Sequence, residues 1–198
     1  IHTMRQVIRL MEVVDQFTVV SAAPTEDRFK NAKSAYFFDG RTAYIKTQRP
    51  GPLGKSPRTI CTWAQTASPD QQIILRWGGI AGGRDFRAEF SYKEEGVSAD
   101  IVNGAVTYSA DVADGKWHHY CFVLYKNVNP TVRDIRVFMD GASLSNVIAT
   151  SPGNAAVNTS NQDPIHIGGG ASEMFSGSLD DIRIYNRALS AAEVKALY

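Results

Sequence analysis

The stretch FSGSLDDIRIYNRALSAAEVKALY, from Phe175 to Tyr198, decides the fold of this chain. Its first half mixes apolar and charged residues in a β-forming run, which predicts a strand with at least one buried face. Ser190 then stands three residues before Glu193, the spacing of a helix capping box. Leu189 and Val194 stand at the positions of a hydrophobic staple. We therefore expect the chain to end as a strand, a turn and a short capped helix.

Turn signals recur along the rest of the chain. Four Asx-Gly pairs, the strongest short signals for hairpins, separate runs of apolar and aromatic residues. Many short strands at such spacing predict an all-β, antiparallel, two-sheet sandwich. The four pairs are Asp39-Gly40, Asn103-Gly104, Asp114-Gly115 and Asp140-Gly141.

The N-terminal stretch has a different pattern. Met4, Val7, Ile8, Met11 and Val14 recur at helical spacing, which predicts a helix over about Thr3–Asp15, although the many valines leave a strand open. We expect residues 1–20 to form an extension and residues 21–198 to form the domain. The extension would either pack on the side of the domain or dock a neighbouring domain or chain.

Composition excludes several classes of partner. The 198 residues are enough for one β domain with its own core. The chain has 21 Lys and Arg against 20 Asp and Glu, a net charge of +1, with no long run of like charge. This balance argues against nucleic acid as a partner. No apolar run approaches the roughly 20 residues that cross a bilayer, so we expect no membrane insertion.

Two cysteines, Cys61 and Cys121, each lie in a run that reads as a strand. If those strands are neighbours with the cysteines opposed, their separation suits a disulfide. The alternative is a pair of buried free thiols, which are common as small core residues. Spacing alone leaves both open.

Several short motifs occur in a particular order. They are Asp27-Arg28-Phe29, Phe38-Asp39-Gly40, Trp117-His118-His119, the hairpin Val137–Gly141, Ile165–Gly169 and the closing segment quoted above. The ordered set resembles the laminin-G-like, concanavalin A-like jelly-roll family. The resemblance implies an antiparallel jelly-roll sandwich that usually serves as a binding module and seldom carries out chemistry.

Pentraxins, a related jelly-roll group, carry joined cysteines on the two corresponding strands. This similarity implies a Cys61–Cys121 disulfide and an oxidising compartment, so that the protein would be extracellular, at the cell surface or periplasmic. The pentraxin calcium loop is replaced here by Gly168–Glu173, which holds one carboxylate. A double-calcium site of the pentraxin kind is therefore not expected.

A structural Ca²⁺ is a further implication of the family resemblance. In related jelly rolls an acid at the position of Asp180 can bind Ca²⁺ together with backbone carbonyls from an early turn, for which Asp39 and the Gly40 carbonyl are candidates. Calcium takes six or more oxygen ligands. The alternative is that Asp180 accepts backbone hydrogen bonds and that Asp39 makes its own turn.

Candidate ligand contacts lie around the glycine-rich segment that joins two expected strands. Its glycines let the backbone approach a ligand, and Arg84 and Asp85 could fix a hydroxyl or a carboxylate. Trp77 is a candidate for stacking on a sugar. The alternatives are an unoccupied hairpin tip and a tryptophan packed in the core.

Catalysis is not expected. Retaining glucanases need two carboxylates about 5 Å apart on one strand face, and no E-x-D-x-x-E run occurs. The four histidines have no zinc-like spacing. We expect a non-catalytic module that binds a glycan or a protein partner, with a structural or assembly domain docking through its N-terminal segment as the alternative. A polysaccharide hydrolase or lyase is a distant third. Further domains of a larger chain are possible neighbours.

Overall fold

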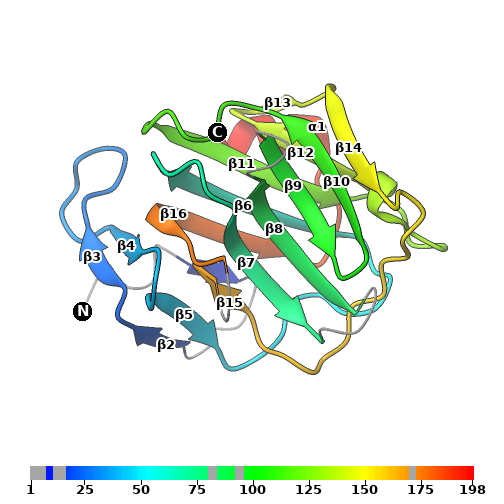
Figure 1. Ribbon diagram of the computed structural model, residues 1–198, viewed down its shortest axis with the longest axis horizontal. Coiled ribbons are helices and arrows are strands. Elements are labelled where there is room, and N and C mark those ends of the chain that lie inside the picture. Colours follow the sequence, from blue (N-terminus) through cyan, green and yellow to red (C-terminus); the bar gives the residue numbers. More distant parts are fainter. Residues whose placement is uncertain (1–7, 11–16, 80–83, 92–95, 170–172) are drawn as a thin grey trace.

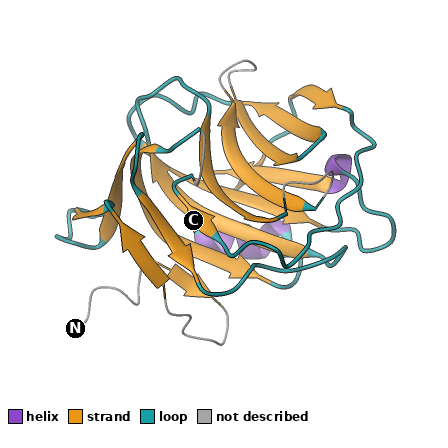
Figure 2. Cartoon of the chain, turned by 60° about the horizontal axis from the view of Figure 1, so that its bottom comes forward, coloured by secondary structure: helices purple, strands orange, loops and turns teal. Residues whose placement is uncertain are grey.

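The computed structural model describes residues 8–10, 17–79, 84–91, 96–169 and 173–198. Within these ranges two sheets face each other, and β7 to β10 cross in front of β6, β11 and β16 in Figure 1. Most of the regular secondary structure is strand, as Figure 2 shows. The main hydrophobic core lies between the two sheets. The predicted antiparallel jelly-roll sandwich is confirmed.

The order of strands in each sheet mixes elements that are distant in the sequence. The first sheet runs β13 (Ala142–Ser143), β12 (Ile135–Met139), β11 (Trp117–Leu124), β6 (Arg58–Gln65), β16 (Ser176–Tyr185), β4 (Ala35–Asp39) and β3 (Ala23–Thr25). The second runs β14 (Val147–Ser151), β10 (Gly104–Ser109), β9 (Gly96–Ile101), β8 (Asp85–Ser91), β7 (Gln72–Gly78), β15 (His166–Ile167), β5 (Tyr44–Thr47) and β2 (Phe17–Val20). One 3₁₀ turn, η1 (Val132–Asp134), precedes β12.

The closing segment folds as its sequence predicts. Helix α1 (Ala191–Leu197) begins after Ser190, whose hydroxyl accepts from the Glu193 N–H at 3.2 Å. In return the Ser190 N–H donates to the Glu193 carboxylate at 2.8 Å. Leu189 and Val194 are both buried, which confirms the staple. No helix within the described ranges has the length and apolar character needed to cross a bilayer.

Strand β16 contains a bulge that explains its uneven apolar spacing. Leu179, Ile182 and Ile184 all belong to the core, although a regular strand would turn the first two to opposite faces. The register with β6 shifts between Asp180 and Arg183, and Asp181 has a φ of 51°. One extra residue at this point restores the inward direction of the apolar side chains.

The two cysteines lie opposite each other on β6 and β11 and form a disulfide, with their Cα atoms 4.1 Å apart. This confirms the predicted pairing. Helix α1 packs over the bond on the outer side of the first sheet. The small cluster beneath the helix consists of Cys61, Cys121, Val123, Phe138, Leu189 and Val194.

The four Asx-Gly pairs separate into two kinds of turn. Asn103-Gly104 and Asp140-Gly141 make hairpins, between β9 and β10 and between β12 and β13. The prediction of hairpins is wrong for Asp39-Gly40 and Asp114-Gly115, because each leads the chain from one sheet into the other. A tight turn reverses the backbone whether or not the next strand joins the same sheet.

The expected N-terminal helix is wrong where the structure describes it. β1 (Ile8–Leu10) is extended and pairs in parallel with Ile182–Ile184 of β16. The rest of Thr3–Asp15 lies outside the described residues. A valine-rich sequence can form a helix or a strand, and here pairing with β16 favours the strand. Phe17–Val20 pair with β5, and the domain boundary after residue 20 stays a prediction.

Candidate functional site

The outer face of the second sheet carries a row of polar side chains across five neighbouring strands. Register pairs link Lys46 to His166, His166 to Arg76, Arg76 to Arg87 and Arg87 to Asp100. Their neighbours along each strand point inward into the core. We call this surface the charged face. Its residues are Tyr44, Lys46, Arg76, Arg87, Asp100, Asp163 and His166.

One end of the charged face combines an ion pair with two flat rings. Arg76 Nη2 lies 3.2 Å from Asp163 Oδ2, and Asp163 Oδ1 lies 3.4 Å from His166 Nε2. The His166 ring stacks on Tyr44 with 5.8 Å between ring centroids and 22° between planes. Neither ring nitrogen of His166 makes a well-aligned hydrogen bond to another described residue. Burial lowers the pKa of His166, so the ring is neutral at pH 7 and offers one donor and one acceptor.

Paired charges also fill the middle of the charged face. Arg87 Nε donates to Asp85 Oδ2 at 2.7 Å, and Arg87 Nη1 lies 3.8 Å from Asp100 Oδ1. These charges are held by one another, which fixes the positions of their donors and acceptors.

Glu89 is a buried acid on the same side of β8 as Arg87. It is 3% exposed, and its Oε2 has no hydrogen-bond partner among the described residues. Burial raises the pKa of Glu89 to about 8, and repulsion from Asp100 adds to the rise. At pH 7 this carboxyl is therefore mostly protonated and can donate a hydrogen bond.

The residues predicted to contact a ligand are not among those of the charged face. Trp77 is 0% exposed, donates from Nε1 to the Pro52 carbonyl at 3.0 Å, and stacks on Phe86. Asp85 is also 0% exposed, because its second oxygen accepts from the Val102 N–H at 2.6 Å. The core-packing alternative therefore describes Trp77 better, Asp85 is enclosed in the same way, and a binding role for either stays untested. Arg84 is exposed at the end of its loop, and its role in binding stays a prediction.

The predicted calcium residues are not brought together. Asp39 Oδ1 accepts from the N–H groups of Arg41, Thr42 and Ala43 at 2.8–2.9 Å, and these bonds hold the pKa of Asp39 well below its usual range. The Gly40 N–H donates to the Phe175 carbonyl. Asp39 pairs with Ser176, four residues before Asp180 on β16, which corresponds to about 13 Å along a strand. The turn-making alternative therefore describes Asp39 better, and Ca²⁺ at these three residues stays untested.

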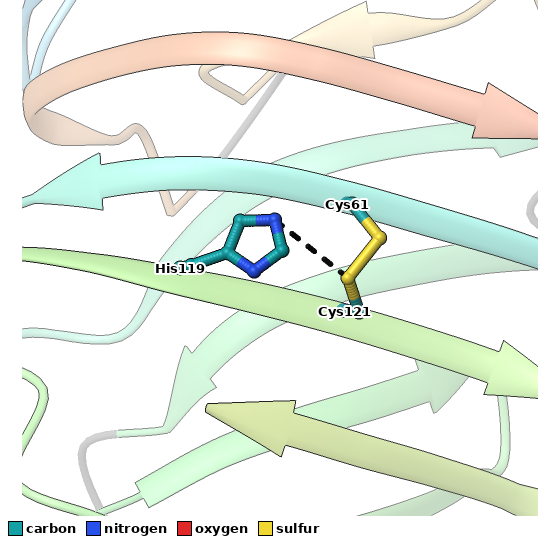
Figure 3. A group of neighbouring side chains, drawn as sticks. All are labelled: Cys61, His119 and Cys121. Atoms are coloured by element: carbon teal, nitrogen blue, oxygen red, sulfur yellow. Dashed lines mark hydrogen bonds between the residues drawn. A yellow bond between two sulfur atoms is a disulfide. The ribbon is translucent and has the colours of Figure 1, made fainter. Parts of the chain in front are cut away.

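One group of His, Cys, Asp and Glu side chains in the described part of the chain is close enough to share an ion. It consists of Cys61, His119 and Cys121, whose sulfurs are already bonded to each other, as Figure 3 shows. His119 Nε2 lies 3.8 Å from the Cys121 sulfur. The histidine thus packs against the disulfide, and the sulfurs are not free to bind a metal.

His119 predicts a specific dependence of stability on pH. Burial lowers its pKa from 6.5 to about 4, and the positive charge of Arg183 acts in the same direction. The folded state binds this proton less tightly, so the contribution of His119 to stability is complete above pH 6.5 and is lost as the pH falls to 4. The expected loss is about 3 kcal/mol. Urea denaturation at pH 7 and pH 4 should show a smaller difference in His119→Gln than in the wild type. An equal difference would contradict this assignment.

Sequence reasoning missed most of the charged face. Arg76, Asp163 and His166 come from β7, a loop and β15, which the sequence does not place together. A signal was present in single polar residues inside otherwise apolar runs, such as Arg76 in QIILRWG and Arg87 in DFRAEF. Such interruptions mark the outward side of a strand whose other side is in the core.

The family that the sequence matches agrees with the observed fold. The sequence profile described as the concanavalin A-like lectin/glucanases superfamily matches residues 39–195. None of the curated proteins compared with the chain matches it.

Several solved structures share the fold. Domain 4 of AbnA, an extracellular arabinanase from Geobacillus stearothermophilus in complex with arabinotriose, has a TM-score of 0.62 and 14% identity over 91% of this chain and 87% of its own. A heptameric SAP-like pentraxin from Limulus polyphemus has a TM-score of 0.59 and 18% identity, over 81% and 79%. The Ruminococcus gnavus IT-sialidase CBM40, bound to alpha2,3 sialyllactose, has a TM-score of 0.54 and 19% identity over 74% of this chain and 83% of its own. At these identities the likeness shows the fold.

Proposed function

Because the chain belongs to the concanavalin A-like lectin/glucanases superfamily, we propose that it is a glycan-binding module and that the charged face holds the glycan. The arabinanase domain and the sialidase module are both solved with an oligosaccharide, which supports this class of ligand. The observation that carries the proposal is the stacked Tyr44–His166 pair beside the Arg76–Asp163 ion pair.

Sugars present two kinds of surface, and this end of the charged face offers a match to each. The C–H side of a sugar ring is apolar and packs well on flat rings. The hydroxyls around its edge can accept from a guanidinium and donate to a carboxylate. Since Arg76 and Asp163 already fix each other, little side-chain freedom is lost when a ligand binds.

The proposed module binds without transforming its ligand. The accessible acids Asp163 and Asp100 each lie beside an arginine, an arrangement that suits recognition better than proton transfer. We also propose that it acts outside the cytoplasm, because disulfides persist in oxidising compartments and the Cys61–Cys121 bond lies under α1.

A glycan array tests the proposal directly. We expect specific binding by the wild type and at least about tenfold weaker binding, roughly 1.4 kcal/mol, in Tyr44→Ala and Arg76→Ala, because a few central residues carry most binding energy. Arg136→Ala is the matched control, since Arg136 is exposed on β12 of the first sheet.

The same array separates the competing interpretations. Equal binding by both charged-face variants would contradict the proposed surface. Loss in Arg84→Ala alone would move the site to the rim loop. Binding to no glycan would contradict the function itself and would favour a protein partner.

A further inference from the structure

A separate group of charges joins the turn after β3 to strand β16 of the first sheet. Arg28 Nη1 lies 2.5 Å from Asp180 Oδ2, and Arg28 Nη2 lies 3.5 Å from Asp181 Oδ2. The side chains of Arg28, Asp180 and Asp181 are 17%, 7% and 14% exposed. One guanidinium thus bridges two neighbouring and largely buried carboxylates.

The bulge in β16 lets both acids reach the same cation. Consecutive residues of a regular strand point to opposite faces, so adjacent aspartates would normally be separated by the sheet. Asp181, with its φ of 51°, is the extra residue in the bulge. Arg183 also holds Asp181, with Nη2 2.7 Å from the same Oδ2 and Nε donating to Oδ1 at 3.2 Å.

The turn itself holds Arg28 in place. The Asp27 carboxylate accepts from the N–H groups of Phe29 and Asn31 at 2.8 and 2.9 Å, and from Asn31 Nδ2 at 2.9 Å. The Arg28 guanidinium lies 4.5 Å from the ring centroid of Phe29 and 4.5 Å from that of Trp63. The cation is therefore fixed by two aromatic rings as well as by its acids.

These residues do not fit a calcium ion. Calcium takes six to eight oxygens, whereas the Asp27 oxygens are occupied by backbone and amide donors and Asp180 is occupied by a guanidinium. Burial raises the pKa of Asp180 to about 6, and Arg28 opposes the rise, so the carboxylate is ionised at neutral pH. A second cation beside Arg28 would meet repulsion.

We infer that Arg28 occupies the cation position at Asp180 and Asp181, so that this domain secures its first turn with its own side chain and needs no Ca²⁺ there. The guanidinium joins residues 152 positions apart, and a bound metal would have the same role. This inference is independent of the proposed glycan function.

Thermal melts in EDTA and in about 10 mM Ca²⁺ test the inference. The wild type should melt at the same temperature in both. Arg28→Ala should melt roughly 5–10 °C lower in EDTA, because the buried Asp180 loses its cation and Asp181 keeps only Arg183. It should also gain about 3 °C from Ca²⁺, because Asp180 and the space left by the side chain become available to a weakly bound ion.

The control is Arg187→Ala, which removes an exposed ion pair with Glu193 of similar length and should change the melting temperature little. A wild-type melt that rises with Ca²⁺ would overturn the inference. An Arg28→Ala protein that gains nothing from Ca²⁺ would also overturn it, since Arg28 would then be an ordinary ion-pair residue. If Arg28→Ala does not fold in EDTA, folding restored by Ca²⁺ would support the inference. A failure to fold in Ca²⁺ as well would overturn it.

Discussion

Replacing Arg58 by methionine is expected to lower the free energy of unfolding by about 4–5 kcal/mol. Arg58 is 0% exposed, and burial lowers its pKa to about 10. Its guanidinium donates to the carbonyls of Pro52, Leu53, Gly54 and Ser56, and to the Thr159 hydroxyl. Methionine keeps much of the volume but leaves these acceptors without donors.

The loss should be visible in two measurements. Urea denaturation reports the change in stability, and limited proteolysis should show earlier cleavage in residues 50–57, which Arg58 holds against the sandwich. Arg41→Met is the matched control, because Arg41 lies in an exposed turn. If the free energy of unfolding of Arg58→Met changed by less than about 1 kcal/mol, water would be satisfying the carbonyls that lose their donors.

Removing the disulfide is expected to cost about 4 kcal/mol. The bond joins residues 60 positions apart, and opening a loop of that length increases the entropy of the unfolded chain. Both cysteines are 0% exposed beneath α1, so Cys61→Ala with Cys121→Ala also loses packing.

Urea denaturation of the double variant separates these two effects. Loss of the cross-link should raise the m-value, because the unfolded chain exposes more surface. Val123→Ala is the control: it removes packing from the same cluster and should leave the m-value unchanged. An unchanged m-value and a loss below about 1 kcal/mol in the double variant would contradict the role given to the bond.

The features predicted correctly from the sequence are those with local causes. Ser190 and Glu193 form the capping box because both partners lie within one turn of the helix. The ordered turns and motifs predicted the jelly roll, and the similarity to pentraxins predicted the pairing of Cys61 with Cys121.

The features that sequence reasoning missed depend on long-range register. The bulge at Asp181 sets which acids face Arg28, and nothing near Arg28 in the sequence shows this. Asp85 looks like a loop residue, yet Val102 and Arg87 cover it after folding. The charged face forms only when β5, β15, β7, β8 and β9 lie side by side.

The charged face of the second sheet is expected to bind a glycan. The most direct measurement is a titration of the ¹⁵N-labelled domain with the best glycan from the array, followed by amide chemical shifts. We predict saturable shifts centred on Tyr44, Arg76 and His166. Shifts confined to the first sheet and α1, or no shifts at saturating glycan, would contradict the claim.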